Sequence, residues 1–157
     1  MARRRQFLVG VATAGVVTIA GCSSSGNQSE TGPEMAVEQY FTEAQNANTE
    51  GVNAVLHPEA PSYPRENITA PDEEITLNEV NQVSSRELIE QRSANSNLTE
   101  QQIQQGVNRT EQSLNRVENE TGVDESSIIL VSWEQAGEER EQEFVVVQDD
   151  GEWYVYL

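Results

Sequence analysis

The sequence predicts an α+β domain in which N-terminal helices pack on a curved, mostly antiparallel sheet that ends as a β-meander. Two observations predict this class. Between residues 35 and 119, most apolar residues recur at helical spacing. After residue 127, they gather in short runs rich in β-branched and aromatic residues, which are typical of strands. Helices that come first and strands that come last indicate segregated elements rather than an alternating α/β order.

The first part of the domain is expected to begin with two helices. One helix face from Met35 onward collects residues at i, i+3, i+4 and i+7: Val37, Tyr40, Phe41 and Ala44. A second, shorter helix carries Val52, Val55 and Leu56. Pro58 ends it, because the residue before a proline avoids the helical region. Three prolines in the segment 60–74 predict an extended loop.

One strand and one long helix are expected in the middle of the chain. The strand has a single break in its alternation and carries Ile75, Leu77, Val80 and Val83. The helix runs from about Thr99 to Asn119, and Gly122 ends it. Its apolar stripe consists of Ile103, Val107, Leu114 and Val117.

Three strands are expected at the C-terminal end: Ser127–Glu134, Phe144–Val147 and Trp153–Leu157. The last two are joined by a hairpin turn at residues 149–152, in which Gly151 accepts a positive φ. Alternation places Trp153, Val155 and Leu157 on one face of the last strand, and Tyr154 and Tyr156 on the other.

The chain is strongly acidic, with 27 acidic residues, nine arginines, no lysine and a formal net charge of −18. Self-repulsion of this size strains a compact domain at low ionic strength. At molar salt the Debye length falls to about 3 Å, which removes most of that repulsion. The composition therefore resembles that of proteins from halophilic archaea. It also argues against a nucleic-acid partner, because no basic stripe is present to neutralise phosphates.

Residues 1–21 have the order of a cleaved signal peptide. A basic start is followed by an apolar run from Phe7 to Ala20, which is shorter than the about 20 residues that a membrane-spanning helix needs. Within it, Arg4, Arg5, Phe7 and Leu8 match the twin-arginine pattern R-R-x-F-L, whose pathway exports folded proteins.

The next residues, Ile19-Ala20-Gly21-Cys22, resemble a lipobox. The resemblance implies cleavage before Cys22 and a lipid on its thiol, hence a protein anchored on the outer face of the cell membrane. Cys22 is the only cysteine, so no thiol remains for disulfides, redox chemistry or metal. Residues 22–33 are rich in Ser and Gly and are expected to be a flexible tether. A single α+β domain then occupies residues 34–157.

His57 is the only histidine, and it has two interpretations. It can act as an acid–base group if a carboxylate lies beside it, or it can cap the end of the helix that precedes Pro58. One histidine and a lipidated cysteine cannot supply the three or four ligands of a zinc site. No cofactor is expected.

Two further groups of residues are candidates for surface or ligand contacts. Aromatic residues on neighbouring predicted strands either line a cavity or fill the core: Trp133, Trp153, Tyr154 and Tyr156. Asn-x-Ser/Thr sequons are candidates for glycosylation outside the cell: Asn27, Asn67, Asn97, Asn108 and Asn119.

A family resemblance covers about Glu34 to Leu157. The first helices ending in Leu56-His57-Pro58, together with a last strand entered through Asp150-Gly151-Glu152-Trp153-Tyr154, resemble the nuclear-transport-factor-2-like fold. The resemblance implies a cone with a cavity at its wide end, although the segment Glu87–Asp124 departs from the usual spacing. Three functions follow as hypotheses: a non-catalytic module that binds a small molecule or an envelope protein, an enzyme that uses His57, and an acidic spacer.

Replacing Cys22 by Ser removes the nucleophile that would carry the lipid. We expect the domain to leave the membrane fraction or to persist as unprocessed precursor, as measured by cell fractionation and intact mass. Ser24→Ala, which lies in the same tether, serves as the control. An unchanged mature mass with full membrane retention of the Cys22→Ser protein contradicts lipidation.

Overall fold

The computed structural model describes residues 32–94 and 96–157. The expected signal peptide, Cys22 and most of the tether lie outside these residues. The described part contains four helices and four strands, in the order α1-α2-β1-α3-α4-β2-β3-β4. The strands form one open antiparallel sheet in chain order. The α+β class and the C-terminal meander are therefore confirmed. Within the described ranges, none of the helices combines the length and the apolar character needed to cross a membrane.

The two N-terminal helices are α1 (Pro33–Gln45) and α2 (Thr49–Val55). A proline suits the first turn of α1, where its missing N–H has no helical partner to lose. The side chain of Asn48 caps α2 by accepting a hydrogen bond from the Gly51 N–H at 3.1 Å. Leu56 lies just beyond α2 in extended conformation and pairs with Val155 as an isolated parallel bridge.

The middle of the chain forms β1 (Ile75–Val83), α3 (Ser85–Ser93) and α4 (Glu100–Thr121). The predicted break in β1 is a bulge between Leu77 and Glu79. The predicted long helix is also confirmed: Thr99 caps it, and Gly122 ends it with a φ of 74°.

Helix α3 was not expected from the apolar pattern. Its sequence signal is a capping box, in which the Ser84 side chain accepts from the Glu87 N–H and the Glu87 carboxylate accepts from the Ser84 N–H. Leu88 is its only buried residue, and Ile89 beside it is partly buried. Two adjacent apolar residues do not repeat at helical spacing, so the apolar pattern alone does not reveal this helix.

The last three strands are β2 (Glu125–Gln135), β3 (Glu138–Asp149) and β4 (Glu152–Tyr156). β3 begins well before the predicted Phe144. Its first residues are exposed and polar, and they are drawn into the sheet by the tight turn at Ala136 and Gly137, both at positive φ. The second hairpin turn has positive φ at both Asp150 and Gly151, as a two-residue type I′ turn requires.

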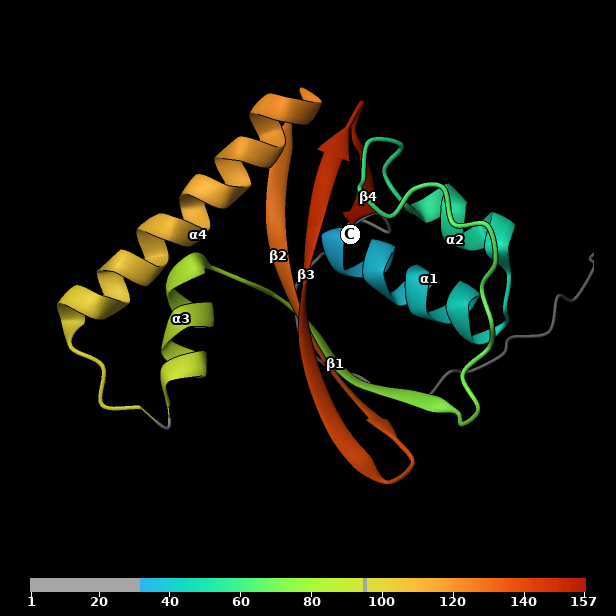
Figure 1. Cartoon of the computed structure of the whole chain (residues 1–157), viewed down its shortest axis with the longest axis horizontal. Coiled ribbons are helices and arrows are strands. Elements are labelled where there is room, and N and C mark those ends of the chain that lie inside the picture. Colours follow the sequence, from blue (N-terminus) through green and yellow to red (C-terminus); the bar gives the residue numbers. More distant parts are fainter. Residues whose placement is uncertain (1–31, 95) are drawn as a thin grey trace, which may run out of the picture.

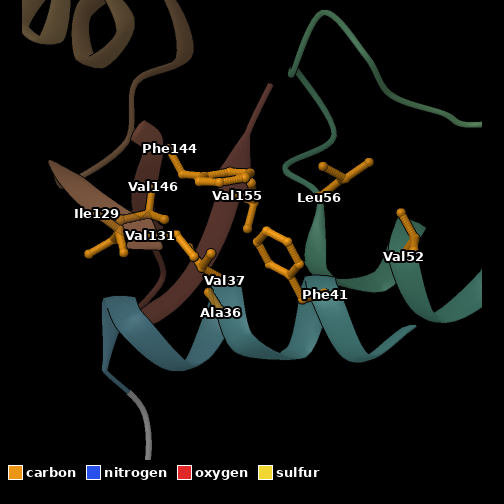
Figure 2. Close-up of a cluster of buried hydrophobic side chains, with 10 residues drawn as sticks. All are labelled: Ala36, Val37, Phe41, Val52, Leu56, Ile129, Val131, Phe144, Val146 and Val155. Atoms are coloured by element: carbon orange, nitrogen blue, oxygen red, sulfur yellow. The ribbon is translucent and has the colours of Figure 1, made fainter. Parts of the chain in front are cut away.

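Helices cover both faces of the sheet (Figure 1). α1 and α2 lie on one side, which we call the first face, and α3 and α4 lie on the other, the second face. The main core fills the first face, where Phe41 of α1 points toward Phe144 of β3 at a ring-centroid distance of 5.5 Å (Figure 2). Phe41 also packs against Trp133 of β2, at a ring-centroid distance of 5.4 Å.

Phe41→Ala removes the ring that joins α1 to the sheet. Because the side chain is 6% exposed, we expect the free energy of unfolding to fall by about 3–5 kcal/mol. Met35→Ala on the same helix, where the side chain is 44% exposed, should change it by less than about 0.5 kcal/mol. Denaturant titration in molar KCl measures both, and equal losses for the two variants contradict the packing described here.

Candidate functional site

A cleft of about 340 Å³ lies between the second face of the sheet and the α3–α4 pair. Ile128 of β2 and Val145 of β3 form its base, and these two residues are direct register partners in the β2–β3 ladder. Ile89 of α3 and Leu114 of α4 line its walls. The cleft is therefore apolar where helices and sheet meet.

Gly106 allows α3 to approach α4 closely at this cleft. A Cβ atom at this position would come within 3.0 Å of Cγ2 of Ile89, which is tighter than ordinary van der Waals contact. Each helix also contributes one buried apolar residue, Leu88 from α3 and Val107 from α4. The two helices thus form a hairpin whose spacing depends on a glycine in mid-helix.

Polar contacts hold this hairpin over the sheet. Arg86 at the start of α3 bonds Glu90 at 2.8 Å and Glu100 at the start of α4 at 2.5 Å. These hydrogen bonds raise the pKa of Arg86, and the bond from Arg86 lowers the pKa of Glu100. At the other end of α4, Glu118 accepts from the backbone N–H and the hydroxyl of Ser126, at 3.0 and 2.6 Å.

Two arginines stand at the rim of the cleft, Arg92 from α3 and Arg109 from α4. Arg92 forms a salt bridge with Glu143 of β3, which also lines the cleft. Arg109 is exposed and has no carboxylate within 4.0 Å among residues 32–94 and 96–157.

The cleft arginines were not among the residues singled out from the sequence. Arginine at an exposed helix position is ordinary, and only the docking of α4 onto β2 and β3 brings Arg109 to an apolar cavity. The only signal in the sequence was the rarity of arginine, since residues 34–157 contain six arginines beside 26 acidic residues.

His57 is buried, with 3% of its surface exposed, at the edge of the sheet beside β4. The backbone N–H of His57 donates to the Val155 carbonyl, and the ring Nδ1 accepts from the Glu59 backbone N–H at 3.2 Å. In the neutral ring the proton is then on Nε2, which lies 3.5 Å from Oδ2 of Asp149. A carboxylate does lie beside His57, yet His57 does not line the α3–α4 cleft or any of three other clefts on the described residues.

The four candidate aromatic residues separate between the two faces. Trp133 and Trp153 pack against the core of the first face. Tyr154 and Tyr156 lie on the opposite face of β4, with ring centroids 5.8 and 6.3 Å from that of His57. The Tyr154 hydroxyl donates to Glu152 at 2.8 Å, and this hydrogen bond, followed by burial, raises the pKa of Tyr154. A shallow cleft of about 290 Å³ under the start of α1 is lined by Trp153 and Tyr154, without Trp133 or Tyr156.

The sequons differ in backbone conformation. Asn27 lies outside the described residues. Asn67 and Asn97 are exposed in loops, whereas Asn108 and Asn119 are exposed on α4.

The described side chains also bear on metal binding. In the part of the chain that the structure describes, no three His, Cys, Asp or Glu side chains converge to hold a metal ion. No protein-family model, curated protein or solved structure matches the chain. The functional conclusion therefore depends on the geometry of the domain.

A glycan acceptor must offer its amide from an accessible, non-helical segment, as surface loops do. If the domain is folded when it leaves the cell, Asn67 and Asn97 should carry glycan, whereas Asn108 and Asn119 should remain bare. Mass mapping of peptides from the native protein checks this site by site. Glycan on Asn108 or Asn119, or bare asparagine at both loop sites, contradicts the expectation.

Proposed function

We propose that this chain is a cell-surface lipoprotein of a halophilic archaeon, exported by the twin-arginine route and anchored by a lipid on Cys22. Its folded domain is a non-catalytic module that binds a small ligand in the cleft between the α3–α4 hairpin and the sheet. The cleft itself is the observation that carries the proposal.

The composition of the cleft supports binding rather than catalysis. Its volume of about 340 Å³ lies within the range of about 300–1,000 Å³ typical of small-molecule sites. Apolar residues form its base, and a few polar groups stand at its rim. Its polar lining consists of two arginines, Glu143, Thr110 and Ser113, so it offers no histidine to activate a hydroxyl.

The likeness to the nuclear-transport-factor-2-like cone is part of the same proposal. The order of two N-terminal helices, a first strand and a C-terminal meander supports it. The segment 87–124, which departs from the usual spacing of that fold, contains most of α3 and all of α4. The helical side of the proposed binding site therefore comes from the part of the chain in which this protein differs from the family pattern, and the sheet supplies its base.

The alternative of an enzyme using His57 receives less support. The ring is packed against two tyrosines, and both of its nitrogens face groups of the protein. Nε2 makes no hydrogen bond among the described residues, but His57 is 3% exposed, so a substrate would have to displace neighbouring side chains to reach it. His57 is better explained as the residue that joins the segment after α2 to the edge strand β4.

Thr110→Phe places a ring in the cleft, since Thr110 lines it. We expect the variant to lose saturable binding of the neutral apolar fluorophore N-phenyl-1-naphthylamine, measured by fluorescence in molar KCl. Asn108→Phe adds the same ring to α4 two positions away, about 200° around the helix, and should bind like the wild type. Circular dichroism verifies that both variants are folded.

Two results oppose the proposal. One is a wild-type protein that shows no saturable binding of the fluorophore. The other is equal binding by the folded Thr110→Phe and Asn108→Phe variants, which would locate the fluorophore elsewhere on the domain.

A further inference from the structure

The cleft carries positive charge at its rim, although the chain as a whole has a formal net charge of −18. Two of the six arginines after residue 22 line this one cleft. Arg86, Arg92 and Arg140 each have a carboxylate within 4.0 Å among the described residues, whereas Arg65, Arg109 and Arg116 do not. Of the two arginines that line the cleft, Arg109 is therefore the one without such a partner.

The sequence of α4 leaves Arg109 without an acidic neighbour on its own helix. Side chains three or four positions apart lie beside each other on a helix surface. For Arg109 these positions hold Gln105, Gly106, Gln112 and Ser113, none of which is charged. Arg116 on the same helix has Glu120 four residues later, and Arg86 bonds Glu90 at that spacing.

The tertiary structure supplies no acidic partner either. Glu143 lines the cleft together with Arg109, but it already pairs with Arg92. Throughout the described ranges, no carboxylate oxygen lies within 4.0 Å of Arg109. Its guanidinium therefore retains five hydrogen-bond donors and a full charge for a bound anion.

Hydroxyl groups stand on the same stretch of α4. Thr110 and Ser113 line the cleft together with Arg109 and Leu114. Each hydroxyl can donate one hydrogen bond to an anionic oxygen. From α4, the cleft lining thus includes a cation, two hydroxyls and an apolar side chain.

We infer that the cleft binds a single-chain anionic amphiphile, whose apolar part lies against Ile128 and Val145 and whose carboxylate, sulfate or phosphate group is held by Arg109. This inference rests on the proposed function, because it names the ligand class of the same cleft. The volume of about 340 Å³ suits one short chain rather than a two-chain lipid.

Displacement of N-phenyl-1-naphthylamine by three compounds with the same ten-carbon chain tests the head group. Decanoate, decanol and decyltrimethylammonium carry an anionic, a neutral and a cationic head group, and each is used below the concentration at which it forms micelles or separates from molar KCl. We expect decanoate to displace the fluorophore at the lowest concentration and decyltrimethylammonium at the highest. Direct contact with Arg109 accounts for the order, since long-range attraction is screened at this salt concentration.

Arg109→Gln should weaken decanoate binding by about fivefold, the upper range for an exposed ion pair. Binding of decanol and of the fluorophore should fall by less than binding of decanoate, since neither carries a charge for Arg109 to pair with, and circular dichroism verifies that the variant is folded. Arg116→Gln removes an arginine from the same helix without touching the cleft lining and should leave all three affinities unchanged.

The possible results separate a wrong ligand class from a wrong binding function. If the fluorophore binds in the cleft but decanoate is no better than decanol, or Arg109→Gln behaves like Arg116→Gln, the anionic ligand class is wrong and the binding function stands. If the fluorophore does not bind saturably, both are wrong.

Discussion

The pairing of β2 with β3 is the contact on which both halves of the domain depend. Ile129 and Phe144 face α1 as register partners, while Ile128 and Val145 face α4 as the next pair. An antiparallel sheet commonly leaves one face to water, but these two strands are apolar on both faces. The chain must therefore supply helices to both sides, and α1 and the α3–α4 hairpin do so (Figure 1).

Helices fill the first face of the sheet more completely than the second, and the space left on the second face is the candidate site. On the first face, aromatic rings from α1 and the sheet pack together, with Phe41 against Phe144 (Figure 2) and also against Trp133. On the second face, polar contacts hold the hairpin to the strands, with Arg92 paired with Glu143 and Glu118 bonded to Ser126. A cleft of about 340 Å³ remains between the hairpin and the strands. Filling it with ligand would bury apolar surface that the fold leaves open.

In so acidic a chain, the few arginines link separate elements of the fold. Arg86 joins the starts of two helices, and Arg92 joins α3 to β3. Self-repulsion among the carboxylates favours separation of these elements at low salt, whereas molar salt screens it. Short-range contacts then determine how the hairpin sits on the sheet. Of the two arginines in the cleft, Arg109 makes no such contact within the described domain.

The sequence by itself determined most of the local elements, though not α3 or the first half of β3, because caps, turns and apolar periods act over a few neighbouring residues. The long helix from its Thr99 cap to Gly122, the turn at Gly151 and the two-faced alternation of β4 could all be predicted. Tertiary structure alone decided the site. The position of His57 against Tyr154 depends on the bridge between Leu56 and Val155, which lie far apart in sequence. Likewise, the neutral neighbours of Arg109 can be counted along α4, but its place above an apolar cleft follows only when α4 packs across β2 and β3.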